Sequence, residues 1–173
     1  MKNITKIFLL SSLLLGMMFS SCNNQQQCDD VTDCVDKVES GVHQISVEEL
    51  KVEIDNNADF YLIDVREARE YFPGYIPTAI SMSSGILPFV INKKSVWEAK
   101  KRYVPEKSSV IVLYCKKGAR SILAADLLMR MGYTNVKYLK GGWQAWEITY
   151  PLEYDKQLKK LNGEEKKEAP SSC

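Results

Sequence analysis

A cysteine between a buried strand and a helix is the side chain in this sequence best placed for nucleophilic chemistry. Cys115 directly follows the apolar, β-branched run 109–114, and a segment of helical periodicity begins at Ala119. The first backbone N–H groups of a helix have no partner within it, so together with the helix macrodipole they favour an anion. Gly118 gives the intervening loop the freedom to turn several N–H groups inward. The pattern predicts a reactive thiolate at Cys115 rather than the inert core thiol that a lone cysteine usually is.

Positive charge surrounds this cysteine in the sequence. Lysines and an arginine lie in the loop and at the start of the helix, and nearby cations stabilise a thiolate over a thiol. The same loop is suited to binding the oxyanion end of a substrate. The predicted substrate-binding residues follow the cysteine up to the first turn of the helix: Lys116, Lys117, Gly118, Ala119, Arg120 and Ser121.

The remainder of the chain alternates strand and helix patterns that would position this loop. Apolar and β-branched runs predict strands at 43–46, 60–65, 79–83, 109–114 and 136–139. Helical spacing and end signals predict helices at 47–55, 67–72, 95–103, 119–131 and 143–148. This alternation is typical of a parallel α/β sheet with helices on both faces, whose sites lie at the carboxyl ends of the strands. We therefore expect Asp64 and Arg66, at the end of one strand, to lie at the same edge of the sheet as Cys115.

Sequence motifs in a fixed order carry a specific resemblance. They are Leu62 to Arg66 with Glu70-Tyr71, Gly74 to Ile80, Cys115 to Arg120, and Leu139 to Trp143 with Trp146. On these motifs the chain from about Ile45 to Trp146 resembles the rhodanese-like (sulfurtransferase) domain family. Two departures lie in the second motif, where Tyr75 replaces the usual His and Thr78-Ala79 replaces the usual Gly-Ala.

The resemblance implies a fold and a reaction. The fold is a three-layer α/β domain with a mostly parallel sheet of about five strands flanked by helices. The reaction is sulfur transfer: the Cys115 thiolate attacks the sulfane sulfur of thiosulfate or a similar anionic donor, sulfite leaves, and a thiol or cyanide acceptor takes the sulfur from the persulfide. Arg120 is expected to orient the loop or bind substrate, and Asp64 and Arg66 to support the loop or form a plain structural ion pair. The resemblance requires no metal ion and no organic cofactor.

Other functions stay open from the sequence. Cysteine phosphatases and arsenate reductases have similar loops of the form C-x5-R, whereas Arg120 gives C-x4-R, a smaller cradle suited to a sulfur atom rather than to phosphate. A non-enzymatic rhodanese-like docking or sulfur-carrier module is a further alternative, although such modules often lack the cysteine. A Cys–His hydrolase would need His43, the only histidine, as its base, and nothing in the sequence places it against Cys115.

The composition excludes several classes of protein. The 173 residues suffice for one domain and a tail. The 23 Lys and Arg against 22 Asp and Glu give a net charge of +1, which provides no basic field for general nucleic-acid binding. A single histidine argues against a His-rich metal site, and five cysteines are too few for a disulfide scaffold.

Residues 1–21 are predicted to be a lipoprotein signal peptide. Lysines precede the apolar stretch 7–19, which is shorter than the roughly 20 residues that a membrane-spanning helix needs. Phe19-Ser20-Ser21 before Cys22 resembles a bacterial lipobox, which makes Cys22 the first residue of the mature protein and its site of lipidation with palmitate. We therefore expect a lipid-anchored protein of the bacterial cell envelope. Asn23 is not the Asp that marks inner-membrane retention in some bacteria, which favours the periplasmic face of the outer membrane.

The expected domain boundaries follow from these assignments. Residues 22–42 are predicted to be a lipid-anchored tether with an acidic, Cys-containing segment, 43–150 the rhodanese-like domain, and 151–173 a charged tail. Within the tether, Cys28 and Cys34 either close a small disulfide loop, which an oxidising compartment permits, or remain two unpaired thiols on different faces of a helix.

Overall fold

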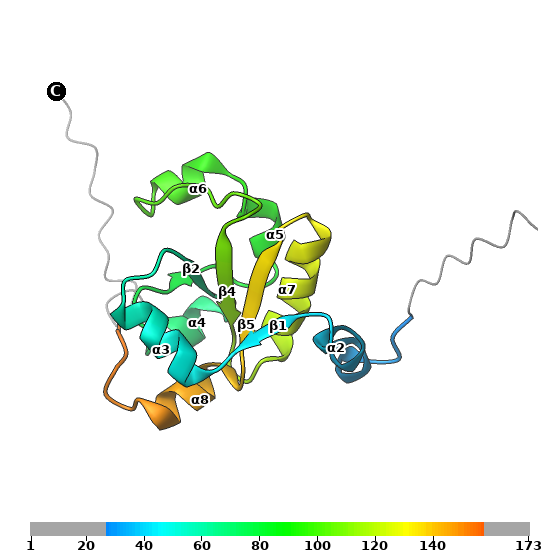
Figure 1. Ribbon diagram of the computed structural model, residues 1–173, viewed down its shortest axis with the longest axis horizontal. Helices are drawn as coiled ribbons and strands as arrows, with labels where there is room; N and C mark the ends of the chain where they lie inside the picture. The colour runs from blue at the N-terminus through cyan, green and yellow to red at the C-terminus, as the bar shows by residue number, and fades with distance from the viewer. Residues whose placement is uncertain (1–26, 158–173) are drawn as a thin grey trace, which may run out of the picture.

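Parallel strands form one sheet in the order β1-β5-β4-β2-β3 (Figure 1). This computed structural model describes residues 27–157. The strands are β1 (His43–Ile45), β2 (Tyr61–Asp64), β3 (Ile80–Ser81), β4 (Val110–Tyr114) and β5 (Asn135–Leu139). In the register of the inner strands, Asp64 at the end of β2 lies opposite Tyr114 at the end of β4. The two strands therefore deliver their following residues, Arg66 and Cys115 among them, to one edge of the sheet, as the sequence predicted.

Helices cover both faces of the sheet. They are α2 (Val31–Glu39), α3 (Val47–Asp55), α4 (Ala68–Tyr71), α5 (Leu87–Val90), α6 (Lys94–Glu98), α7 (Ala119–Arg130) and α8 (Gly142–Thr149). One core contains buried residues of α2, α5, α6 and α7, and a second contains buried residues of α3, α4 and α8. The expectation of a three-layer α/β domain with a five-stranded sheet is confirmed.

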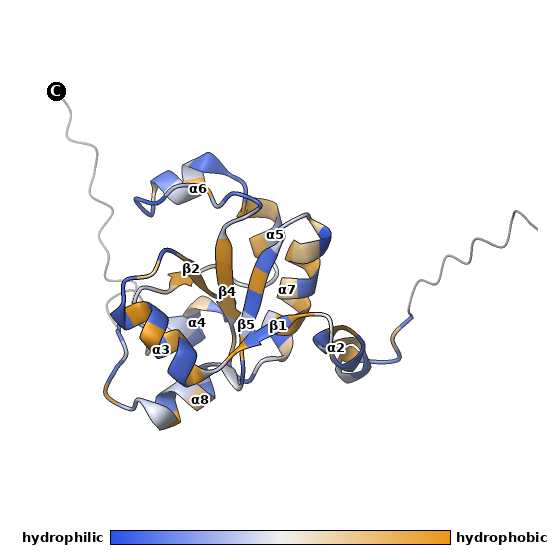
Figure 2. Cartoon of the chain, in the orientation of Figure 1, coloured by the Kyte–Doolittle hydropathy of each residue, from blue (hydrophilic) through white to orange (hydrophobic). Residues whose placement is uncertain are grey.

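The central strand β4 shows how the sequence produces these layers. Its Ile111 and Leu113 belong to the core under α7, and its Val112 and Tyr114 belong to the core under α3 and α8. Successive side chains of a strand point to opposite faces, so a strand buried on both faces must be apolar throughout. Figure 2 accordingly shows β4 as almost wholly hydrophobic, whereas β5 alternates.

The prediction of a helix over 95–103 was wrong in length, and helix α5 was not predicted. Helix α6 ends at Glu98, and Lys101 shortly after it has a φ of 55°, a left-handed conformation that no helix continues through. Helix α5 has four residues with Pro88 near its start. A helix this short completes barely one turn, so it leaves no apolar periodicity in the sequence.

Helix α2 extends the packed fold upstream of residue 43, the predicted start of the domain. Val35 is buried in the same core as α7, and the Tyr138 hydroxyl donates to Glu39 Oε1 at 2.7 Å. Cys28 and Cys34 form a disulfide. Cys28 lies ahead of the helix, so the two cysteines do not have to share one helix face. The structure therefore selects the disulfide from the two alternatives.

At the other end, the chain stays on the domain beyond residue 150. Tyr75 and Asp155 pair through their backbones, and the Trp146 indole N–H donates to the Glu153 carbonyl at 2.7 Å. The segment expected to begin the charged tail at 151 is therefore docked up to 157. The predicted signal peptide, the lipidation site Cys22 and the tail from 158 to 173 lie outside the described residues. Between residues 27 and 157, no helix is long and apolar enough to cross a membrane.

Thr78, which stands where the resemblance expects glycine, adopts a φ of 69°. This left-handed conformation is one that glycine adopts freely and that β-branched residues disfavour. Thr78 is exposed and sits in the turn that leads into β3. The departure therefore affects the conformational energy of this turn and not the loop of Cys115.

Candidate active site

The loop after β4 wraps around the sulfur of Cys115. The Gly118 N–H donates to Cys115 Sγ at 3.2 Å, and the Ser121 hydroxyl lies 3.8 Å from the same sulfur while it donates to the Gly118 carbonyl. Gly118 has a φ of 124°, which an L-residue rarely adopts. Cys115 is buried at the base of this loop. The predicted arrangement, in which a helix N-terminus directs an N–H group toward the thiol, is present.

Helix α8 fixes the orientation of the loop from the other side. The Trp143 N–H donates to the Cys115 carbonyl at 2.8 Å, and the Gln144 N–H donates to the Lys116 carbonyl at 3.0 Å. In a planar trans peptide group, the C=O and the N–H point in opposite directions. Because α8 binds these two loop carbonyls, the N–H groups of the same peptides point away from α8. The first N–H groups of α8, which have no partner within the helix, thus hold the loop peptides in place.

Close approach of the two backbones requires Gly142, the first residue of α8. It has a φ of 59°, and a Cβ added there would overlap the Cys115 carbonyl oxygen. Gly141 and Gly142, both with a positive φ, make a turn ahead of Trp143 in the motif Leu139 to Trp143. The sequence did not indicate that the turn touches the loop of Cys115, because these hydrogen bonds are made by backbone atoms.

A buried ion pair, Asp64 with Arg66, lies next to the contact between α8 and the loop of Cys115. Arg66 Nη2 lies 2.6 Å from Asp64 Oδ2 and also donates to the Gly74 carbonyl at 2.7 Å. The Arg66 guanidinium lies over the Trp143 ring at 4.7 Å from its centroid. Burial opposes the charged form of Arg66, but its hydrogen bonds to Asp64 raise its pKa overall. Asp64 and Arg66 thus bond to each other and to the Gly74 carbonyl, contacts that fit the structural ion pair expected from the sequence.

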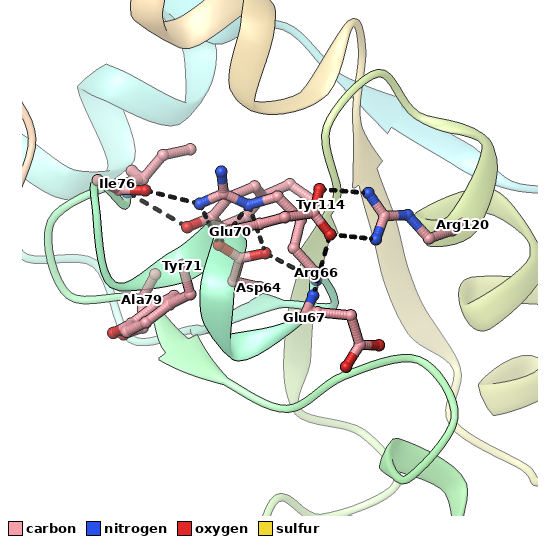
Figure 3. Close-up of polar contacts among 10 residues, drawn as sticks. Asp64, Arg66, Glu67, Glu70, Tyr71, Ile76, Ala79, Tyr114 and Arg120 are labelled. Carbon is pink, nitrogen blue, oxygen red and sulfur yellow. Dashed lines mark hydrogen bonds and ion pairs between the residues drawn. The ribbon is translucent and has the colours of Figure 1, made fainter. Parts of the chain in front are cut away.

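A second ion pair joins the loop helix to α4. Arg120 Nη1 and Nη2 lie 2.7 and 2.8 Å from the two carboxylate oxygens of Glu70 (Figure 3). The hydrogen bonds from Arg120 lower the pKa of Glu70 to about 2, and those of Glu70 raise the pKa of Arg120. From its place in the sequence, Arg120 was expected to orient the loop or bind substrate. Glu70 was noted only as part of a motif, because a pairing across 50 residues leaves no local signal.

Replacing Glu70 tests how much this ion pair adds to the free energy of unfolding. The pKa of Glu70 falls from 4.5 to about 2 on folding. The stabilisation is therefore complete above about pH 5 and is lost as the pH falls toward 2. The Arg120 and Glu70 side chains are 37% and 28% exposed, which limits the pair to at most about 1 kcal/mol. We expect Glu70→Gln to lower the free energy of urea unfolding by up to this amount at pH 7, and the difference to vanish near pH 2.

The control for this measurement is Glu98→Gln, which removes the exposed Lys94–Glu98 pair. That variant is expected to match the wild type at every pH. A Glu70→Gln difference that stays constant from pH 7 to pH 2 would contradict the assignment.

The remaining predicted residues surround the mouth of the site. Lys116 and Lys117 are exposed, and Ala119 begins α7. The two lysines open on a cavity of about 580 Å³, which is lined by Arg66, Glu70, Lys116, Lys117, Trp143, Gln144 and Glu147. His43 is an exposed residue of the edge strand β1, which β5 separates from β4, and in the register of the sheet it is level with Val112, three residues before Cys115. In the described residues, no three His, Cys, Asp or Glu side chains are grouped to hold a metal ion.

Comparison with known proteins agrees with this geometry. Residues 46–149 match the model of the family described as the rhodanese-like domain. The chain is 32% identical to a sulfurtransferase of Allochromatium vinosum over 105 residues, 61% of this chain and 88% of that protein. It is also 32% identical to the putative sulfurtransferase YtwF of Bacillus subtilis, over 61% of this chain and 91% of that protein.

Two solved structures show the same fold. The human single-domain sulfurtransferase TSTD1 superposes with a TM-score of 0.56 at 25% identity, over 61% of this chain and 96% of that one. A protein of unknown function from Rhodopseudomonas palustris, described as a possible tyrosine phosphatase, superposes with a TM-score of 0.60 at 26% identity, over 72% and 94%. With a match of the family model across more than half of its length, the chain belongs to the rhodanese-like domain family.

Proposed function

We propose that this protein is a sulfurtransferase that takes a sulfane sulfur from thiosulfate or a similar donor and carries it on Cys115 as a persulfide. The observation that carries the proposal is the Gly118 N–H donating to Cys115 Sγ at 3.2 Å, inside a loop that opens on a cavity with exposed lysines. Such a donor stabilises the thiolate that attacks and the persulfide anion that results. The relatives described as a sulfurtransferase and a putative sulfurtransferase support sulfur transfer in general.

The transfer needs no net oxidation. The Cys115 thiolate attacks the outer sulfur of thiosulfate, the S–S bond of thiosulfate breaks, and its electron pair leaves with sulfite. Cys115 then holds a persulfide anion in the cradle of the loop. A thiol or cyanide attacks the outer sulfur, and the electron pair of the second S–S bond returns to Cys115 as the thiolate.

A phosphatase reaction is the alternative that the Rhodopseudomonas structure raises. A phosphatase of this type uses its loop arginine to bind phosphate oxygens, a task suited to bidentate hydrogen bonds. Here both terminal nitrogens of Arg120 are occupied by Glu70. The loop is also one residue shorter than C-x5-R. Both features favour a sulfur atom over a tetrahedral phosphate as the bound group.

The function is tested by thiocyanate formation from thiosulfate and cyanide. We expect turnover by the wild-type protein and a loss of about a thousandfold or more in Cys115→Ser, since the nucleophile is removed. The matched control is the double variant Cys28→Ser with Cys34→Ser, which removes the other cysteines between residues 27 and 157 and should retain turnover. Equal activity of wild type and Cys115→Ser, or no activity in folded, reduced wild type, would contradict the proposal.

We also propose that the domain is lipid-anchored in the bacterial cell envelope, at the periplasmic face of the outer membrane. The predicted signal peptide and Cys22 support this location, as does the Cys28–Cys34 disulfide, since such bonds persist in oxidising compartments. The full chain expressed in bacteria is expected to incorporate labelled palmitate, and Cys22→Ala to lose the label. Equal labelling of both proteins would overturn the lipid anchor.

A further inference from the structure

Charges around Cys115 are largely paired. Arg66 is compensated by the buried carboxylate of Asp64, and Arg120 by Glu70. Of the basic side chains that line the mouth, Lys116 and Lys117 are the exposed ones. The site therefore offers an incoming anion much less positive charge than its count of arginines and lysines suggests.

Glu70 is held in place to compensate Arg120. It lies in the first turn of α4, where its Oε2 accepts the Glu67 N–H at 3.2 Å. From there its two oxygens meet the two terminal nitrogens of Arg120 at 2.7 and 2.8 Å. Two parallel hydrogen bonds of this kind fix the orientation of the guanidinium group and also compensate its charge. The charge of Arg120, five residues after Cys115, is thus compensated by Glu70, so the pair adds little net charge to the site.

We infer that Glu70 is a specificity-determining residue, which by pairing with Arg120 favours sulfur donors with one negative charge, organic persulfides, over dianionic thiosulfate. The inference rests on the proposed function, because it concerns the donor of the same Cys115 persulfide. Thiosulfate carries two negative charges to the loop, and an alkyl persulfide anion carries one. A cation left uncompensated near the reacting sulfur would assist the dianion more than the monoanion.

Both donors load the same product by balanced steps. With an alkyl persulfide, the Cys115 thiolate attacks the outer sulfur, the donor's S–S bond breaks, and the electron pair leaves with the alkyl thiolate. With thiosulfate, the electron pair leaves with sulfite. The product in each case is the Cys115 persulfide, so one measurement of sulfur loading compares the two donors directly.

The test is the second-order rate of sulfur loading on Cys115, followed by intact mass, with thiosulfate and with the persulfide of 2-mercaptoethanol. In Glu70→Gln, the ratio of the thiosulfate rate to the persulfide rate is expected to rise about three- to tenfold over wild type, and the rise should shrink at high salt. Glu70→Asp keeps the charge and is expected to keep the wild-type ratio within about twofold.

The matched control is Glu147→Gln, which removes the same charge from the same cavity without releasing Arg120. Because Glu147 is exposed and screened, its ratio should stay within about twofold of wild type. An unchanged or lowered ratio in Glu70→Gln, with its fold intact by circular dichroism, would overturn the inference. An equal rise in Glu147→Gln would also overturn it. Wild type that loads sulfur from neither donor would instead refute the proposed function itself.

Discussion

Gly142→Ala is expected to destabilise the domain and to suppress sulfur transfer together. An added Cβ would overlap the Cys115 carbonyl oxygen and lie 3.0 Å from the Lys116 carbonyl carbon. Both obstacles are backbone atoms, which cannot rotate away as a side chain would. Alanine would also be strained at the φ of 59°. Overpacking and backbone strain together are expected to lower the free energy of unfolding by about 2–4 kcal/mol.

The effect on activity has a separate cause. Relief of the overlap requires the start of α8 to move away from the loop, which would lengthen the hydrogen bonds from Trp143 and Gln144 to the loop carbonyls. Displacement of a reacting group by about 1 Å costs about a hundredfold in rate. We therefore expect thiocyanate formation by folded Gly142→Ala to fall by about that factor.

Gly85→Ala is the matched control, since an added Cβ there meets no atom within 4 Å. Its unfolding free energy should stay within about 0.5 kcal/mol of wild type, with normal turnover. If Gly142→Ala proved as stable and as active as Gly85→Ala, the role assigned to the close approach between α8 and the loop would be wrong.

Asp64→Asn is expected to have the second large effect. The Asp64 side chain is fully buried and that of Arg66 is 3% exposed, so the substitution leaves a guanidinium buried without its counter-charge. Breaking a buried ion pair in this way costs about 3–5 kcal/mol. Since Arg66 also lies over the ring of Trp143, the loop contact should weaken as well.

The measurement is urea unfolding of Asp64→Asn, Arg66→Met and the double variant. A double-mutant cycle should give a coupling of at least about 2 kcal/mol between the two residues, because each single variant leaves one buried charge unpaired. The exposed pair Lys94–Glu98 provides the comparison, and its cycle should show no measurable coupling. A cost below about 1 kcal/mol for Asp64→Asn would show that water reaches the pair.

Features with a strong local pattern were predicted from the sequence. β4 is apolar on both faces and α7 repeats its apolar residues at helical spacing, so the strand, the helix and the loop between them followed from the order of residue types. The placement of Cys115 and Asp64 at the same edge of the sheet was also predicted, because neighbouring parallel strands end at the same edge.

Features made by contacts between distant segments were not predicted. Glu70 and Arg120 belong to different helices, and the two backbone hydrogen bonds from α8 to the loop involve no side chain whose type would announce them. Helix α2 was assigned to the tether because its segment carries an acidic run, with Asp29, Asp30, Asp33 and Asp36. Its packing depends on the burial of Val35 and on the contact from Tyr138 to Glu39, more than 90 residues apart.

The most direct test of the account is the mass of the reduced protein after incubation with thiosulfate and removal of excess donor. We predict that the wild type gains the mass of one sulfur atom, located on Cys115 by fragmentation, and that cyanide removes it as thiocyanate. Cys115→Ser should gain nothing. Added sulfur on Cys115→Ser, or none on folded wild type with thiosulfate or an organic persulfide, would contradict a persulfide on Cys115.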